Sequence, residues 1–230
     1  MSSALISPDS IIRSFPEPPG KIHLLYGGGE IFPFSLMMAA HALRKGMPIA
    51  VVDGANRFDV HLLARFARER RMDPDEFLRR IYISRGFTCY QMEQAIVGRL
   101  PAFLRSIGSS VAMVFGLLDT FYDQQAPLRE VQQILTRVQA AFGSMKAEGV
   151  SLLLVCREQR VAPEERNRLF IRLKSGVDGV YRMDGEEERL RIEKSQARTL
   201  AANPKPEMLN KYQVMPRAKP RGRSTKQLSP

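Results

Sequence analysis

Five short apolar runs, separated by segments with helical periodicity, limit the folds that this chain can adopt. The runs cover residues 22–26, 48–52, 81–83, 111–115 and 150–155. An uninterrupted apolar run of this length is typical of a strand that is covered on both faces. Strands that alternate with helices are joined by right-handed crossovers, which place them side by side and parallel. We therefore predict an α/β fold with a mostly parallel, twisted sheet and helices on both faces.

Local signals mark where the intervening helices begin and end. Pro33 suits a first helical turn and Gly46 a helix end, so a helix is predicted between them. Asp59 and Asp73 are suitable N-caps for the next two helices. Residues 89–106 are also helix-like, and Pro101 within them predicts a bend or a split.

The clearest helix follows Pro127 and ends before Gly149, because its apolar residues recur at three- and four-residue steps. Further along, segments 177–183 and 189–193 flank the turn-prone pair Asp184-Gly185. This arrangement predicts a β-hairpin near the C-terminus.

Composition divides the 230 residues into three parts. Residues 1–20 are a proline-containing lead-in, residues 21–200 the core domain, and residues 201–230 a basic tail. No apolar run reaches the roughly 18 to 20 residues that a membrane span needs. We therefore expect a cytoplasmic protein without a membrane partner. Association with the nucleoid is compatible with this expectation.

The formal net charge of +11 is concentrated in the tail. Residues 203–230 hold seven basic residues against one acidic residue and have almost no apolar periodicity, so we expect disorder in the free protein. Such a segment can bind DNA phosphates without sequence preference, or it can simply be solvated. The candidate nucleic-acid-binding residues are Lys211, Arg217, Lys219, Arg221, Arg223 and Lys226.

Gly27, Gly28 and Gly29 lie between the first predicted strand and its following helix. Phosphate-binding loops occupy the same place and have the pattern G-x-x-x-x-G-K-[ST]. In that pattern backbone N–H groups and a lysine bind the phosphates, and a hydroxyl binds Mg²⁺.

The chain departs from this pattern where the chemistry is needed. Counted from Gly27, the positions of the second glycine, the lysine and the hydroxyl hold Phe32, Pro33 and Phe34, and Ser35 comes one residue later. We therefore interpret the glycines as a vestigial loop or a structural turn that binds no cofactor.

Short segments at 20–27, 51–59, 81–87 and 189–195 together resemble the ATPase core of the RecA-like recombinase superfamily. The similarity is strongest to the archaeal and eukaryotic strand-exchange proteins, their paralogs and the KaiC-type proteins. It covers about residues 20–197 through element order and short matches. The resemblance implies a RecA-like fold.

Two further departures concern the acidic groups of that family. Its second strand is followed by a glutamate that positions the attacking water, and here the matching residue is Ala55. Its fourth strand ends in a magnesium-ordering aspartate, whereas here residues 111–115 are followed by Gly116. Asp119 and Asp123 lie too far along to replace it without a register shift. Since phosphoryl transfer depends on these positioned charges, we expect no ordinary Mg·ATP hydrolysis.

Other site chemistries have little support. Cys89 and Cys156 are far apart and have no metal-ligand spacing, so we interpret them as reduced core thiols. His23, His41 and His61 share no spacing on one helix face, and no serine-nucleophile motif is present.

Two groups of residues admit alternative roles. Four arginines in or beside residues 158–168, the counterpart of a DNA-contacting loop in the recombinases, would contact phosphates or pair with neighbouring glutamates. The large apolar residues after the glycines would form a partner surface or pack in the core. These residues are Arg157, Arg160, Arg166 and Arg168 in the first group, and Phe32, Phe34, Met37 and Met38 in the second.

The sequence therefore favours a pseudo-ATPase, a non-catalytic RecA-like protein in DNA recombination, repair or damage-tolerant replication. Its expected partner is a RecA-like ATPase or a DNA polymerase, in a hetero-oligomer held near DNA by the tail. The alternative is a nucleotide-responsive ATPase or regulator with an unorthodox phosphate loop, in which Asp53 or Asp119 binds a metal.

Overall fold

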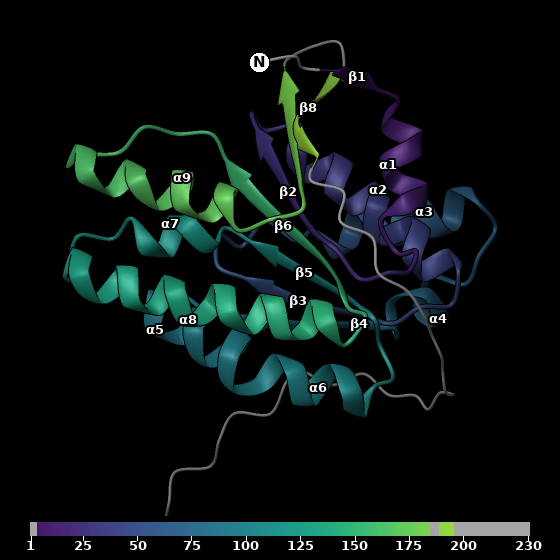
Figure 1. The fold of residues 1–230 in the computed structure, drawn as a ribbon. Coiled ribbons are helices and arrows are strands. Elements are labelled where there is room, and N and C mark those ends of the chain that lie inside the picture. The colour runs from purple at the N-terminus through teal and green to yellow at the C-terminus, as the bar shows by residue number, and fades with distance from the viewer. Residues whose placement is uncertain (1–3, 185–188, 196–230) are drawn as a thin grey trace, which may run out of the picture.

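The structure is a computed structural model that describes residues 4–184 and 189–195. Within these residues, eight strands form one sheet in the order β1-β8-β7-β2-β6-β5-β3-β4 (Figure 1). The strands are β1 (Ala4–Ile6), β2 (Ile22–Gly27), β3 (Ile49–Asp53), β4 (Ile81–Arg85), β5 (Val111–Phe115), β6 (Ser151–Arg157), β7 (Gly179–Asp184) and β8 (Arg189–Ser195).

The six neighbouring strands from β7 to β4 are all parallel. β8 pairs antiparallel with β7, and β1 adds antiparallel to β8 at the sheet edge. The predicted α/β fold, with a mostly parallel sheet, flanking helices and a C-terminal hairpin, is therefore confirmed.

Helices cover both faces of the sheet, with α1 to α4 on one face and α5 to α9 on the other (Figure 1). Their bounds are α1 (Pro8–Ser14), α2 (Ile31–Arg44), α3 (Val60–Glu69), α4 (Pro74–Leu78), α5 (Cys89–Glu93), α6 (Leu100–Ser106), α7 (Leu117–Phe121), α8 (Leu128–Ala147) and α9 (Asn167–Ser175). A π-helical stretch, η1 (Gln94–Arg99), joins α5 to α6, and a 3₁₀ turn, η2 (Glu164–Arg166), precedes α9.

Two apolar layers lie on the two sides of the sheet, because successive side chains of a strand point to opposite faces. In β2, Leu24 packs in the layer under α5 to α9 and Leu25 in the layer under α1 to α4. All five residues of β3 and of β5 are buried, as expected for strands in the middle of a covered parallel sheet.

Part of the proline-containing lead-in belongs to the folded domain. α1 buries Ile11 and Ile12, and Phe15 immediately after it is fully buried in the same layer as α2. Sequence analysis predicted no element here. The boundary between lead-in and core consequently lies within one continuous packed layer.

The predicted interruption near Pro101 takes the form of the π-helical stretch η1 immediately before it. Proline has no N–H to donate, and its ring clashes with the carbonyl group four residues earlier in a regular helix. Widening the preceding turn is one way in which a helix accommodates this clash.

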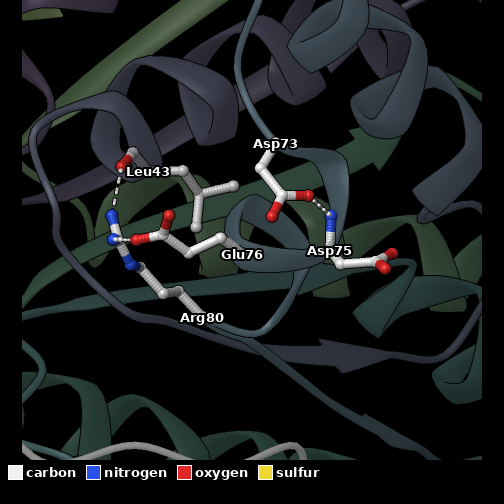
Figure 2. Close-up of polar contacts among 5 residues, drawn as sticks. All are labelled: Leu43, Asp73, Asp75, Glu76 and Arg80. Atoms are coloured by element: carbon white, nitrogen blue, oxygen red, sulfur yellow. Dashed lines mark hydrogen bonds and ion pairs between the residues drawn. The ribbon is translucent and has the colours of Figure 1, made fainter.

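Polar contacts around α4 fix the ends of two helices (Figure 2). The Asp73 carboxylate accepts a hydrogen bond from the Asp75 N–H at 2.9 Å and so caps α4, as predicted. The Arg80 guanidinium donates to Glu76 at 2.8 Å and to the Leu43 carbonyl oxygen at 3.4 Å. Arg80 thereby connects α4 to the last turn of α2.

No helix within the described residues has both the length and the apolar character needed to cross a membrane. Cys89 and Cys156 are free and buried, which confirms their interpretation as core thiols. Burial raises the pKa of both thiols, that of Cys156 to about 12. Both are therefore protonated at neutral pH.

Candidate functional site

The carboxyl ends of the parallel strands meet at one edge of the sheet, where α/β proteins commonly bind ligands. The strand register places Gly27 at the end of β2 beside Arg157 of β6 and Met183 of β7. It also places Asp53 at the end of β3 beside Phe115 at the end of β5. We refer to this region as the carboxyl edge.

The connection from β2 to α2 is very short. Only residues 28–30 separate the two elements, so α2 already includes the positions that an extended phosphate loop would occupy. Gly27 has a φ of +152°, and a Cβ there would lie 2.3 Å from the Met183 carbonyl oxygen. A glycine is therefore required at this position for close approach of two backbones, which supports the interpretation of a structural turn.

Glu30 brings a negative charge to the start of α2. Its carboxylate lies against Gly28, where a Cβ would be only 2.5 Å from Glu30 Oε2. The N-terminus of a helix attracts anions, and here a carboxylate of the chain itself lies beside it. A triphosphate approaching the same turn would therefore meet a negative charge at Glu30.

Two polar groups at the start of α2, the Phe32 N–H and the Ser35 hydroxyl, already have partners within the turn and helix. The Phe32 N–H donates to the Gly29 carbonyl oxygen, and Pro33 has no N–H to offer. Ser35, the one nearby hydroxyl, is fully buried and donates to the Phe32 carbonyl oxygen at 2.7 Å. Its oxygen is therefore not exposed for binding Mg²⁺.

The apolar residues after the glycines divide between core and surface. Phe34 and Met38 are buried in the layer beneath α2, so for them the core alternative holds. Phe32 is half-buried, with the Arg57 guanidinium 5.4 Å from its ring centroid. Met37 is 45% exposed and faces outward.

Asp53 is fully buried and uses both carboxylate oxygens to hold the following loop. Oδ1 accepts hydrogen bonds from the N–H groups of Ala55 at 3.1 Å and Arg57 at 3.2 Å. Oδ2 accepts from the Phe58 N–H at 3.0 Å. A buried carboxylate with three backbone donors is well satisfied, and its environment is that of a structural group.

Ala55 and Gly116, the two positions at which the resemblance led us to compare acidic residues, lie against each other. Gly116 has a φ of +59°, and a Cβ there would lie 2.3 Å from the Ala55 Cβ. Gly54 is also confined, since its added Cβ would lie 2.9 Å from the Gly116 carbonyl oxygen. The loops after β3 and β5 therefore pack together and leave little room for a larger side chain at position 54 or 116.

Asp119 at the start of α7 is the other acidic candidate at this edge. It is half-buried, and burial raises the pKa of its carboxyl group, whereas Arg157, Gln159 and Arg57 act in the opposite direction. The Gln159 amide donates to Asp119 Oδ1 at 3.5 Å.

Between residues 7 and 183, no group of three or more His, Cys, Asp or Glu side chains is arranged to hold a metal ion.

The arginines near residues 158–168 have different environments. Arg166 is 3% exposed and donates to the carbonyl oxygens of Phe121 and Ala126, so neither predicted role applies to it. Arg157, Arg160 and Arg168 are exposed. Glu158 pairs with Arg182 of β7 at 3.0 Å, a partner from another strand that the local charge pattern did not indicate.

The six candidate nucleic-acid-binding residues of the tail lie outside the described residues. They are Lys211, Arg217, Lys219, Arg221, Arg223 and Lys226.

Comparison with known proteins adds no further assignment. The chain matches no protein-family model, and no curated protein is significantly similar to it.

Proposed function

We propose that this chain is a non-catalytic RecA-like accessory protein in DNA recombination, repair or damage-tolerant replication. The observation that carries the proposal is the tight turn of residues 28–30, which retains the strand-glycine-helix connection without the phosphate-binding groups. Glu30 contributes a carboxylate there, and the Ser35 hydroxyl bonds within α2. The turn therefore lacks the positive charge and the free hydroxyl group that phosphoryl transfer needs.

In this proposal the chain acts by binding other macromolecules. RecA-like domains commonly assemble side by side, so the proposed partner is a RecA-like ATPase or a DNA polymerase in a hetero-oligomer, an analogy at the level of the fold. The basic tail would hold this assembly near DNA. Phosphate contacts of this kind release counterions and give affinity without sequence preference.

Removal of residues 203–230 is expected to weaken binding to a labelled DNA duplex at least about tenfold near 0.1 M salt. Each lost phosphate contact reduces the slope of log K against log salt by about 0.9, so the slope should change by roughly 4 to 6. Fluorescence anisotropy of the full chain and the truncated chain over a salt series measures both quantities.

A length-matched variant separates charge from chain length. It carries glutamine at Lys211, Arg217, Lys219, Arg221, Arg223 and Lys226. We expect it to bind DNA as weakly as the truncated chain does. Equal binding by all three proteins, or binding that does not respond to salt, would exclude the tail as the DNA-binding segment.

A further inference from the structure

An open groove runs along the outer surface of the helical layer formed by α1, α2 and α3. Its volume is about 1020 Å³. The stripe of α2 from Pro33 to Arg44 forms its floor, while α1 and α3 form its two sides. Eleven helical steps of 1.5 Å make this floor about 16 Å long, which corresponds to roughly three turns of a docked helix.

α2 and α3 contribute apolar side chains to the groove. Met37 is 45% exposed although it is large and apolar, and Pro33 beside it is also exposed. Leu62 and Phe66 are half-buried on the facing side of α3. Adjacent apolar side chains at helical spacing are the surface that the apolar stripe of an amphipathic helix covers.

The last turns of α1 and α2 contribute basic side chains. Lys45 pairs with Glu17, whereas Arg13 and Arg44 make no hydrogen bond or ion pair with the described residues. Arg65 and Arg70, on the α3 side, share the single carboxylate of Glu69. The groove therefore has unpaired positive charge, and few of its acidic residues are free to neutralise it.

His41 lies near the charges of Lys45, Arg44 and Arg13 and has a ring nitrogen without a hydrogen-bond partner among the described residues. This nitrogen, Nε2, is buried. Burial lowers the pKa of His41, and Lys45, Arg44 and Arg13 lower it further, against the smaller opposing effect of Glu17. The imidazole is thus neutral at pH 7, and a carboxylate placed beside it would favour its protonated form.

The groove is built from helices whose positions are fixed by contacts elsewhere. Asp59 caps α3 by accepting from the His61 N–H at 2.8 Å. Arg80 binds the Leu43 carbonyl oxygen in the last turn of α2, as Figure 2 shows. A surface that needs little rearrangement loses little entropy when a partner binds.

From this arrangement we infer that the groove binds an acidic amphipathic helix of a partner protein, with its apolar stripe on Met37 and Phe66 and its carboxylates near Arg13 and Arg44. The charge of the groove disfavours two other occupants. Residues 203–230 of this chain are strongly basic, and a second copy carries a net charge of +11. The inference does not depend on whether the carboxyl edge binds a nucleotide or whether the chain binds DNA.

A designed peptide tests the inference on the full chain. The probe is a fluorescein-labelled helix of about 14 residues with leucine at i, i+3, i+7 and i+10, glutamate on the opposite face and alanine elsewhere. We expect saturable binding below about 100 μM, and at least about tenfold weaker binding when lysine replaces every glutamate. The combined substitution Arg13→Glu and Arg44→Glu, and separately Met37→Glu, should each weaken binding of the acidic peptide roughly tenfold or more.

Arg129→Glu provides the matched control, because Arg129 is exposed on α8, on the other face of the sheet. The affinity of the Arg129→Glu variant for the acidic peptide should stay within about twofold of that of the parent chain. The methyl NMR signal of Met37, assigned from a Met37→Leu variant, should shift when the acidic peptide is added. No saturable binding up to about 1 mM, equal binding of acidic and lysine peptides, or indifference to the Arg13 and Arg44 reversals would overturn the inference.

Discussion

Replacement of Asp53 by alanine is expected to lower the free energy of unfolding by about 3–5 kcal/mol. The buried carboxylate accepts three backbone hydrogen bonds, and the substitution would leave the donors of Ala55, Arg57 and Phe58 without their acceptor. Hydrogen bonds to a charged group contribute about 1.5–3 kcal/mol each, and three bonds to one group are less than additive. Urea unfolding followed by circular dichroism measures the effect.

Asp59→Ala is the comparison for this prediction, since Asp59 also accepts backbone hydrogen bonds but lies exposed at the start of α3. Loss of an exposed N-cap costs about 1 kcal/mol. If Asp53→Ala cost no more than Asp59→Ala, Asp53 would not hold the loop of residues 54–58 together. In that case its carboxylate would again be a candidate ligand group.

Introduction of an aspartate at position 116, a change suggested by the resemblance to the RecA-like superfamily, is expected to cost about 2–4 kcal/mol of stability. Gly116 has a left-handed backbone conformation, and an added Cβ would overlap the Ala55 Cβ at 2.3 Å. The Gly116→Asp chain should therefore unfold at a clearly lower temperature and should not gain ATPase activity. Calorimetry together with a phosphate-release assay checks both expectations.

Gly29→Asp is the matched substitution, because an added Cβ at Gly29 meets no atom within 4 Å and its φ is not positive. Its stability should stay within about 0.5 kcal/mol of the parent chain. A Gly116→Asp variant as stable as Gly29→Asp would show that the loops after β3 and β5 leave room for an acidic side chain.

Much of the fold follows from local sequence signals. The buried strands are short apolar runs with clear ends, and the predicted strand at 111–115 coincides with β5. The caps at Asp59 and Asp73 form the predicted hydrogen bonds. These features depend on few residues close in the chain, and for that reason patterns of spacing and composition detect them.

Two of the elements that sequence analysis missed, β1 and α7, depend on distant contacts or lack boundary signals. β1 is three residues long and exists as a strand through pairing with β8, which is far away in the sequence. α7 begins directly after β5, with Gly116 as its only break, so its apolar residues read as a continuation of the strand. Neither periodicity nor capping marks such segments.

At the candidate site, the missing residue types were visible in the sequence, but the way in which the space is filled was not. No sequence motif predicts that the Glu30 side chain lies against Gly28. The contact of Ala55 with Gly116 joins loops that are about sixty residues apart in the chain. The hydrogen bonds from the following backbone N–H groups to the Asp53 carboxylate could have been suggested from the sequence. Aspartate side chains often accept such bonds from nearby backbone in turns. The groove was not predicted, because it depends on how three helices pack.

We expect the carboxyl edge not to bind Mg·ATP, and thermal unfolding with about 5 mM Mg·ATP measures whether it does. A site with a dissociation constant one hundredth of that concentration would add about 2.7 kcal/mol of stability, or roughly 5–10 °C for a chain of this size. We predict a shift below about 1 °C. A shift of several degrees that disappears in Gly28→Arg, accompanied by ATP turnover in the parent chain, would show that the glycine turn binds and hydrolyses the nucleotide.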